Sequence, residues 1–294
     1  MMIGIVQLLR PHQWLKNIFI FLPLFFAGYL LHTELWKESL VVFFAFSFIA
    51  SSIYAFNDIL DIDADRCHPK KNKRPLASGI LNKSTGYIIM VLALFTSLSI
   101  VFVFAGEKMW QVIAILLFYF FMNIAYTIKL KHYPLIDVCI IALGFVLRVV
   151  VGGIATGIEL SHWIILMTFL LALFLAFAKR RDDVILFQET GVQARKKIDR
   201  YNLDLMNQFL TILGGITIVC YIMYTVSEEV IKRLGNNHVY ITALFVLLGI
   251  FRYLQLTLVD LKSGSPTKIL MKDFFVQLCI LGWLSTFIII IYFR

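Results

Sequence analysis

Long apolar segments alternate with polar connections along the whole chain. They fall at roughly 17–32, 38–56, 85–105, 109–128, 135–156, 161–179, 206–226, 239–258 and 272–292. Each is close to the ~20 residues that an α-helix needs to cross a bilayer. The pattern predicts an all-α membrane bundle of about nine transmembrane helices, folded as a single transmembrane domain over residues 1–294. Two polar stretches, near 57–84 and 179–205, are the candidate catalytic loops.

Composition supports the membrane interpretation. Of the 294 residues, 60% are hydrophobic and 15% are charged. Water-soluble domains carry about a quarter charged residues, so this composition excludes a soluble fold. Arg10 and Lys16 precede the first apolar segment and no small-residue cleavage site follows it, so we expect this segment to remain as a span. The four cysteines are far apart and indicate neither a disulfide framework nor a zinc site.

The distribution of basic residues predicts the orientation in the membrane. With the N-terminus inside, most of the 27 lysine and arginine residues fall in cytoplasmic segments. Because cytoplasmic loops are enriched in Lys and Arg, we expect a multi-pass protein of the cell (inner) membrane with a cytoplasmic N-terminus and an external C-terminus. The same rule accounts for the net charge of +9 without a nucleic-acid partner.

The first polar stretch opens with aspartates directly after the second apolar segment. It reads Asn57-Asp58-Ile59-Leu60-Asp61-Ile62-Asp63-Ala64-Asp65. If the helix continues through this stretch, one face within an arc of about 100° carries Asn57, Asp58, Asp61 and Asp65, whereas Asp63 points away. Carboxylates on one stripe repel one another unless a cation neutralises them, and Mg²⁺ is commonly bound by carboxylates together with substrate phosphates. The stripe predicts a magnesium–diphosphate site with Asp58, Asp61 and Asp65 as catalytic metal ligands and Asn57 beside them.

Basic residues follow this motif at once. Arg66, Lys70 and Arg74 lie among them, and guanidinium and ammonium groups bind phosphate oxygens. We therefore assign these three residues to substrate binding. The alternative is a solvated loop of mixed charge at a helix end, which the NDxxDxxxD spacing after an apolar span disfavours.

At these residues the sequence resembles the UbiA superfamily of intramembrane prenyltransferases. The resemblance covers nearly the whole chain, with a first aspartate-rich motif after the second span and a second polar motif after the sixth. It implies that both motifs face the cytoplasm and bind Mg²⁺ and a diphosphate.

Within this superfamily the chain is similar to the branch of decaprenyl-phosphate phosphoribosyltransferases. Four stretches carry the similarity: the entry motif Arg10-Pro11-His12-Gln13-Trp14-Leu15-Lys16-Asn17, the run NDILDIDADRCHPKKNKRPLASG over 57–79, the region from Tyr126 through Lys129 and Asp137 to Arg148 and Gly152-Gly153, and the pair Lys179-Arg180. Through the entry motif, Lys16 joins the expected substrate site. Tyr126 and Lys129, at the inner end of the fourth span, are expected to donate to the leaving phosphate.

The second polar motif departs from the widely spaced aspartates of many aromatic prenyltransferases. It reads Lys179-Arg180-Arg181-Asp182-Asp183. Lys179, Asp182 and Asp183 would share one helical face within about 100°. A lysine among the acids suits a second phosphate better than a second metal. For Arg180 and Arg181, substrate binding and an ordinary basic cap on the span are equally favoured.

Two charged residues lie in the fifth span. Asp137 and Arg148 are about three turns apart and fall within ~20° of each other around the helix. Charged residues inside a span usually face the bundle interior or a watery cavity. We assign both to the substrate cavity, with Arg148 contacting an anionic oxygen. An internal salt bridge of Arg148 is the alternative.

These features predict an Mg²⁺-dependent transferase. The leading hypothesis is transfer of 5-phosphoribosyl from phosphoribosyl diphosphate to a polyprenyl phosphate in the membrane, as a cell-wall precursor step. That donor has two anionic ends, and the chain offers more basic groups than one diphosphate needs. The alternative is an aromatic or quinone-precursor prenyltransferase with a polyprenyl diphosphate donor.

A transporter or lipid-binding membrane protein is a third interpretation. It is disfavoured because the acids cluster at the cytoplasmic ends of the spans, whereas coupling sites of transporters lie near the bilayer midplane. Membrane lipids are expected around the bundle, and homo-oligomerisation is left open.

Overall fold

All regular secondary structure in the described part of the chain is helical. The computed structural model describes residues 2–67, 71–190, 200–261, 269 and 271–292, and none of these residues is in a β-strand. Eight helices among them are long and apolar enough to cross a membrane. The prediction of an all-α, multi-pass membrane protein is confirmed, whereas a ninth span and the orientation of the termini stay predictions.

The chain divides into two compact units. The first comprises Met1–Leu130 and Leu147–Leu160, and the second comprises Lys131–Val146 and Ser161–Arg294. Helix α7 (Ile136–Thr156) contributes residues to both. The single transmembrane domain predicted over 1–294 stays a prediction.

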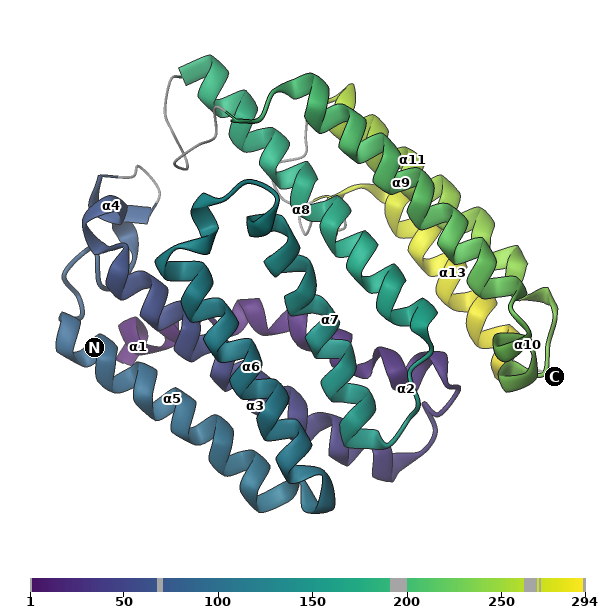
Figure 1. Cartoon of the computed structure of the whole chain (residues 1–294), viewed down its shortest axis with the longest axis horizontal. Helices are drawn as coiled ribbons and strands as arrows, with labels where there is room; N and C mark the ends of the chain where they lie inside the picture. Colours follow the sequence, from purple (N-terminus) through teal and green to yellow (C-terminus); the bar gives the residue numbers. More distant parts are fainter. Residues whose placement is uncertain (1, 68–70, 191–199, 262–268, 270, 293–294) are drawn as a thin grey trace. The chain divides into compact units, whose positions relative to one another are not determined.

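The first unit is organised around α3 (Thr33–Leu60), the long helix that ends at the aspartate motif (Figure 1). The helices packed against it are α1 (Met2–Leu9), α5 (Lys83–Phe104) and α6 (Met109–Ile128). Shorter elements complete the unit: η1 (Pro11–Phe21), α2 (Leu22–Phe26), α4 (Ile62–Arg66), η2 (Lys71–Lys73) and η3 (Gly106–Lys108). Phe46 and Ile49 of α3 are fully buried in its core beside Leu116 of α6.

The segment predicted as the first span is not one α-helix. Residues 11–21 form the 3₁₀-helix η1, which runs directly into α2. Pro11 and Pro23 occupy the first turns of these two helices, where a missing backbone N–H breaks no helical bond. At about 2.0 Å per 3₁₀ residue and 1.5 Å per α residue, the combined rod is roughly 30 Å long, close to the hydrocarbon thickness of a bilayer. Its length therefore suits the first predicted span, the one that is not among the eight long apolar helices.

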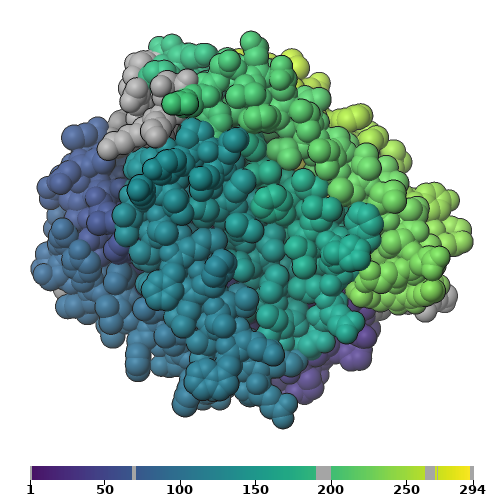
Figure 2. All heavy atoms as spheres, viewed as in Figure 1, coloured from purple at the N-terminus to yellow at the C-terminus, as the bar shows by residue number. Residues whose placement is uncertain are grey.

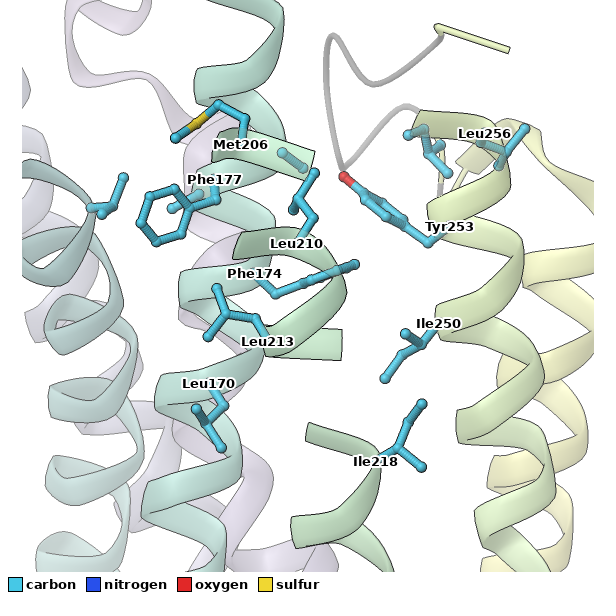
Figure 3. Close-up of a cluster of buried hydrophobic side chains, with 14 of the residues drawn as sticks. Leu170, Phe174, Phe177, Met206, Leu210, Leu213, Ile218, Ile250, Tyr253 and Leu256 are labelled. Atoms are coloured by element: carbon cyan, nitrogen blue, oxygen red, sulfur yellow. The ribbon is translucent and has the colours of Figure 1, made fainter. Parts of the chain in front are cut away.

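The second unit is built from α8 (His162–Thr190), α9 (Leu203–Val226), α11 (Ala243–Leu258) and α13 (Phe274–Tyr292), with the short elements η4 (Leu130–His132), α10 (Glu228–Leu234) and η6 (His238–Thr242). Figure 3 shows its core, in which Phe174 of α8 packs near Leu210 and Leu213 of α9. The rings of Phe174 and Tyr253 lie 5.3 Å apart between centroids. The helix α8 extends beyond the predicted span of 161–179, so residues 179–190 of the second predicted loop are helical.

The outer face of α9 is apolar. Ile212, Ile216, Val219 and Met223 are each 45–59% exposed. They recur every three or four residues, which places them on one side of the helix. The green atoms of α9 lie at the surface in the space-filling view (Figure 2). An apolar helix face of this extent is suited to contact with lipid.

Gly152 on α7 permits a close backbone approach to η1. A Cβ atom at this position would collide with the carbonyl oxygen of Ile20 and lie 3.2 Å from its Cα. The obstacle is backbone, so it has no rotamer through which to move away.

Replacing Gly152 tests this contact. Gly152→Ala should lower the stability of the protein by about 1–3 kcal/mol, because the added methyl group overpacks a backbone contact. Thermal unfolding in detergent measures the effect. The matched control is Gly215→Ala on α9, where an added Cβ meets nothing within 4 Å and should leave the protein as stable or more so. An equal effect of the two substitutions would contradict the assigned contact.

Candidate active site

A ladder of polar contacts fixes η1 against α3. Trp14 Nε1 donates to Ser51 Oγ at 3.0 Å, and Asn17 Nδ2 donates to Ser47 Oγ at 2.8 Å. About two turns of α3 beyond Ser51, Arg10 Nη2 donates to Asp58 Oδ1 at 2.6 Å. The positions rise along η1 as they fall along α3, so the two segments are antiparallel and in register. The ladder thereby brings the N-terminal segment to the first aspartate motif.

Arg10 adopts an unusual backbone conformation at the start of η1. Its φ of 52° and ψ of 56° lie in the left-handed region, which costs a non-glycine residue about 1–3 kcal/mol. Its guanidinium group also lies over the ring of Tyr54, 5.1 Å from the centroid. The strained backbone directs the side chain toward Asp58, and the charged contacts there offset its cost.

Two arginines and two aspartates form a compact charge network. Arg74 Nη1 donates to Asp58 Oδ1 at 2.9 Å and to Asp65 Oδ2 at 2.6 Å. The Asp58 and Asp65 side chains are only 2% and 4% exposed. Buried carboxylates are stable as anions only when cations or donors compensate them, and the guanidinium groups of Arg10 and Arg74 supply that compensation.

The helix does not continue through the motif as the sequence suggested. Helix α3 ends at Leu60, and Asp61 forms the break before α4, with ψ near 9°. Asn57 Nδ2 donates to Asp61 Oδ2 at 3.1 Å across this break. Asp63 has a 96% exposed side chain, in agreement with its predicted position off the stripe. The break therefore replaces one straight stripe with two short helical faces that share the buried carboxylates.

The oxygen donors of this network fit Mg²⁺ chemically. Asp58 Oδ2 is buried and has no hydrogen-bond partner among the described residues. Asp61 and Asp65 add further carboxylate oxygens, the donors that this ion prefers. Across the described part of the chain, no group of three or more His, Cys, Asp or Glu side chains is arranged to hold a metal. The metal assignment of the three aspartates stays a prediction.

Lys16 and Arg148 form a second cationic group in the first unit. Arg148 is 5% exposed, its Nε donates to Asn17 Oδ1 at 2.8 Å, and its Nη2 donates to Tyr119 Oη at 3.2 Å. Its guanidinium lies 4.7 Å from the centroid of the Phe46 ring. Lys16 immediately precedes Asn17 on η1 and is exposed. Its ammonium group and the guanidinium of Arg148 are cations that can bind phosphate oxygens.

The remaining predicted residues of the first unit lie nearer its surface. Arg66 is exposed, and its Nη1 contacts Asp63 at 3.4 Å while its Nε donates to the Ala77 carbonyl at 3.3 Å. Lys129 is exposed at the end of α6, and Tyr126 is half-buried on the same helix. Lys70 lies outside the described residues. The substrate contacts assigned to these residues stay predictions.

A buried ion network lies in the second unit. Arg180 Nε donates to Asp137 Oδ2 at 2.7 Å, and its Nη1 donates to Asp183 Oδ2 at 2.7 Å. The Arg180 side chain is 1% exposed. Arg181 instead donates to Asn207 Oδ1 at 2.7 Å and to the Thr257 carbonyl at 2.8 Å. Both arginines therefore serve as buried connections between helices, unlike an ordinary basic cap at a membrane surface.

The other residues of the second motif flank this network on α8. Lys179 is exposed, whereas Asp182 is half-buried and interacts electrostatically with Tyr253 of α11. Tyr253 Oη and Thr257 Oγ1 are buried and have no hydrogen-bond partner among the described residues. These two hydroxyl groups carry no periodic or motif signal in the sequence.

Sequence reasoning also missed the roles of Arg10, Asn17 and Tyr119. The first two belong to the polar entry motif, which was visible as a run of polar side chains before an apolar segment. What the run did not reveal is its partner, because Arg10 and Asp58 are 48 residues apart. Tyr119 lies within an apolar span and gave no signal.

Fold and site together define a multi-pass helical membrane protein with a buried site of aspartates and arginines. A model described as the UbiA prenyltransferase family matches residues 20–185. The chain therefore belongs to the UbiA prenyltransferase family and is a transferase.

Named relatives and a solved structure agree with this assignment. The chain is 31% identical to decaprenyl-phosphate phosphoribosyltransferase of Mycolicibacterium smegmatis, over 99% of this chain and 93% of that protein. It is 29% identical to the protein of the same name from Mycobacterium tuberculosis, over 96% and 92%. A UbiA homologue from Archaeoglobus fulgidus, solved with DMAPP and Mg²⁺, has the same fold, with a TM-score of 0.70, 17% identity and coverage of 98% and 99%. The resemblance inferred from the motifs is confirmed.

The buried pair of Arg180 and Asp137 yields a stability prediction. Arg180→Met should cost about 3–5 kcal/mol, because it leaves Asp137 as an uncompensated buried charge. The double variant Arg180→Met/Asp137→Leu should recover part of this loss. Equilibrium unfolding in detergent measures both.

An exposed ion pair provides the control. Lys232 and Glu228 on α10 have side chains that are 78% and 88% exposed, so Lys232→Ala should have no measurable effect. If Arg180→Met were equally neutral, the pairing described here would not contribute to stability.

Proposed function

We propose that the protein transfers 5-phosphoribosyl from phosphoribosyl diphosphate to a polyprenyl phosphate. One observation carries the choice of substrates: besides Arg10 and Arg74, which pair with Asp58 and Asp65, the first unit contains a buried arginine elsewhere, Arg148, which donates to Asn17 and Tyr119. A prenyl diphosphate presents one anionic end, whereas the phosphoribosyl donor presents a diphosphate and a 5-phosphate. Two anion sites in one unit therefore favour the phosphoribosyl donor. The names of the relatives support the same reaction.

The first group is assigned to the diphosphate end. Asp58, Asp61 and Asp65 would hold Mg²⁺, which when bound neutralises charge on the diphosphate. Arg66, Lys70 and Arg74 contact diphosphate oxygens, and Tyr126 and Lys129 donate to the leaving group. Lys16 and Arg148 receive the 5-phosphate or the lipid phosphate. Lys179, Asp182 and Asp183 contribute further substrate contacts, and Arg180 orients Asp137 and Asp183.

The reaction needs no proton to be removed from the acceptor. The bond between ribose C1 and the diphosphate oxygen breaks, and diphosphate leaves with the electron pair. An ionised oxygen of the polyprenyl phosphate then forms the new C–O bond. An aromatic acceptor, by contrast, must lose a proton from the attacked carbon. The cationic groups of this unit therefore suffice for the proposed reaction, in which they bind and orient anions.

We place the reaction at the cytoplasmic face of the cell membrane, where it serves the synthesis of a cell-wall precursor. The charge bias along the chain and the likeness to the named relatives support this placement. The alternative, transfer from a polyprenyl diphosphate to an aromatic acceptor, draws support from the UbiA homologue solved with DMAPP.

A transfer assay distinguishes the two reactions. Purified protein receives Mg²⁺, labelled phosphoribosyl diphosphate and a polyprenyl phosphate, and label is expected in the lipid phase. Asp58→Asn should reduce transfer by about 100-fold or more, because it removes a carboxylate charge from the metal–diphosphate site. The matched control is Asp63→Asn, an exposed aspartate of the same motif, which should stay within about twofold of the parent. No transfer, together with turnover of a prenyl diphosphate onto an aromatic acid, would refute the proposal.

A further inference from the structure

Arg10 and a metal ion would need the same carboxylate. Arg10 Nη2 lies 2.6 Å from Asp58 Oδ1, and Arg74 Nη1 lies 2.9 Å from the same oxygen. With Asp65 included, two guanidinium groups balance two carboxylates. A divalent cation bound at Asp58 would lie within a few ångströms of these positive groups, in a place where the low dielectric strengthens repulsion.

We propose that Arg10 competes with the divalent metal for Asp58 and moves to the diphosphate when that ligand binds, so that metal and diphosphate bind cooperatively. The inference rests on the magnesium–diphosphate part of the proposed function and is independent of the donor that carries the diphosphate. It assigns Arg10 a role in substrate binding that the motif of aspartates does not reveal.

The contacts indicate that Arg10, rather than Arg74, is the exchanging residue. Arg74 bridges Asp58 and Asp65, whereas Arg10 contacts only Asp58 among the carboxylates of the described residues. Releasing Arg10 therefore breaks one ion pair and leaves the bridge in place. Asp58 Oδ2, which is buried and has no hydrogen-bond partner in the described part of the chain, is a ready position for the incoming cation.

The surroundings let the side chain of Arg10 move without its backbone. The contacts of Trp14 with Ser51 and of Asn17 with Ser47 hold η1 on α3. The Arg10 side chain is 18% exposed, so it reaches the edge of the site. The face of Tyr54 supports the guanidinium during the exchange. A diphosphate bound beside Asp58 then offers the guanidinium a bidentate partner in place of the carboxylate.

Metal binding without catalysis tests this exchange. Mn²⁺ replaces Mg²⁺ so that electron paramagnetic resonance reports free and bound metal, and inorganic pyrophosphate serves as the diphosphate probe. The variant is Arg10→Gly, because glycine adopts the left-handed backbone of this position without strain. In the absence of pyrophosphate, Arg10→Gly should bind Mn²⁺ about three- to tenfold more tightly than the parent, because the competitor is gone.

Pyrophosphate should then act differently on the two proteins. It should tighten Mn²⁺ binding strongly in the parent, and by a factor about tenfold smaller in Arg10→Gly, because the guanidinium of Arg10, which would transfer to the diphosphate, is absent. Arg10→Lys keeps the positive charge but lacks the forked guanidinium group, so the effect of pyrophosphate on its Mn²⁺ binding should be intermediate. Thermal unfolding in the same detergent shows whether each variant is folded, and Arg10→Lys supplies the comparison if Arg10→Gly is not.

The outcomes separate this inference from the reaction proposed above. Weaker or unchanged Mn²⁺ binding in Arg10→Gly, or an unchanged effect of pyrophosphate, would overturn the exchange. Absence of Mn²⁺ binding to the parent under both conditions would overturn it together with the metal assignment. A failed phosphoribosyl transfer with intact coupling would leave the exchange standing and reject only the donor. Arg233→Ala, which removes an arginine paired with Glu229 at 2.9 Å on α10, should match the parent, and a similar shift in that control would also count against Arg10.

Discussion

The docking of η1 on α3 is the contact on which the first unit depends. Serine hydroxyls on α3 accept from Trp14 and Asn17, and the same alignment carries Arg10 to Asp58. Asn17 also accepts from Arg148 through its other amide atom, so one residue joins the ladder to the second cationic group. The polar contacts are few, but they are buried or partly buried, which makes each of them stronger than the same contact at an aqueous surface.

Buried charge imposes the second constraint. In each unit an arginine crosses to an aspartate on another element: Arg74 to Asp58 and Asp65 in the first unit, and Arg180 of α8 to Asp137 of α7 in the second. Each such group has a large desolvation cost that only its partner offsets. The networks therefore specify which helices lie together more strongly than apolar packing does, since Phe, Leu and Ile side chains tolerate small shifts in register.

The sequence was sufficient for the class of fold and for the position of the first motif. Apolar length is a property of a single segment, so it indicates a spanning helix without knowledge of the rest of the fold. The spacing of Asp58 and Asp65 likewise indicated a shared site, although the helix breaks at Asp61 and the motif bends there. Pairings between distant residues were out of reach: Arg10 finds Asp58 and Arg148 finds Asn17 only through the fold, at separations of 48 and 131 residues. The role of Arg180 was ambiguous for the same reason, because the sequence does not show whether a basic residue at a helix end contacts water or a buried carboxylate.

The ladder between η1 and α3 constrains the length of the N-terminal segment as well as its composition. One residue inserted between Arg10 and Trp14 would rotate every side chain before it by about 120° around a 3₁₀ axis. Trp14 and Asn17 would keep their hydrogen bonds to the serines of α3, but Arg10 would face away from Asp58. Conservative replacements within this stretch change single contacts. An insertion or deletion instead prevents Arg10 from reaching Asp58 while Trp14 and Asn17 hold η1 on α3. Over evolutionary time, the spacing from Arg10 to Asn17 should therefore be more resistant to change than the identity of the residues between them.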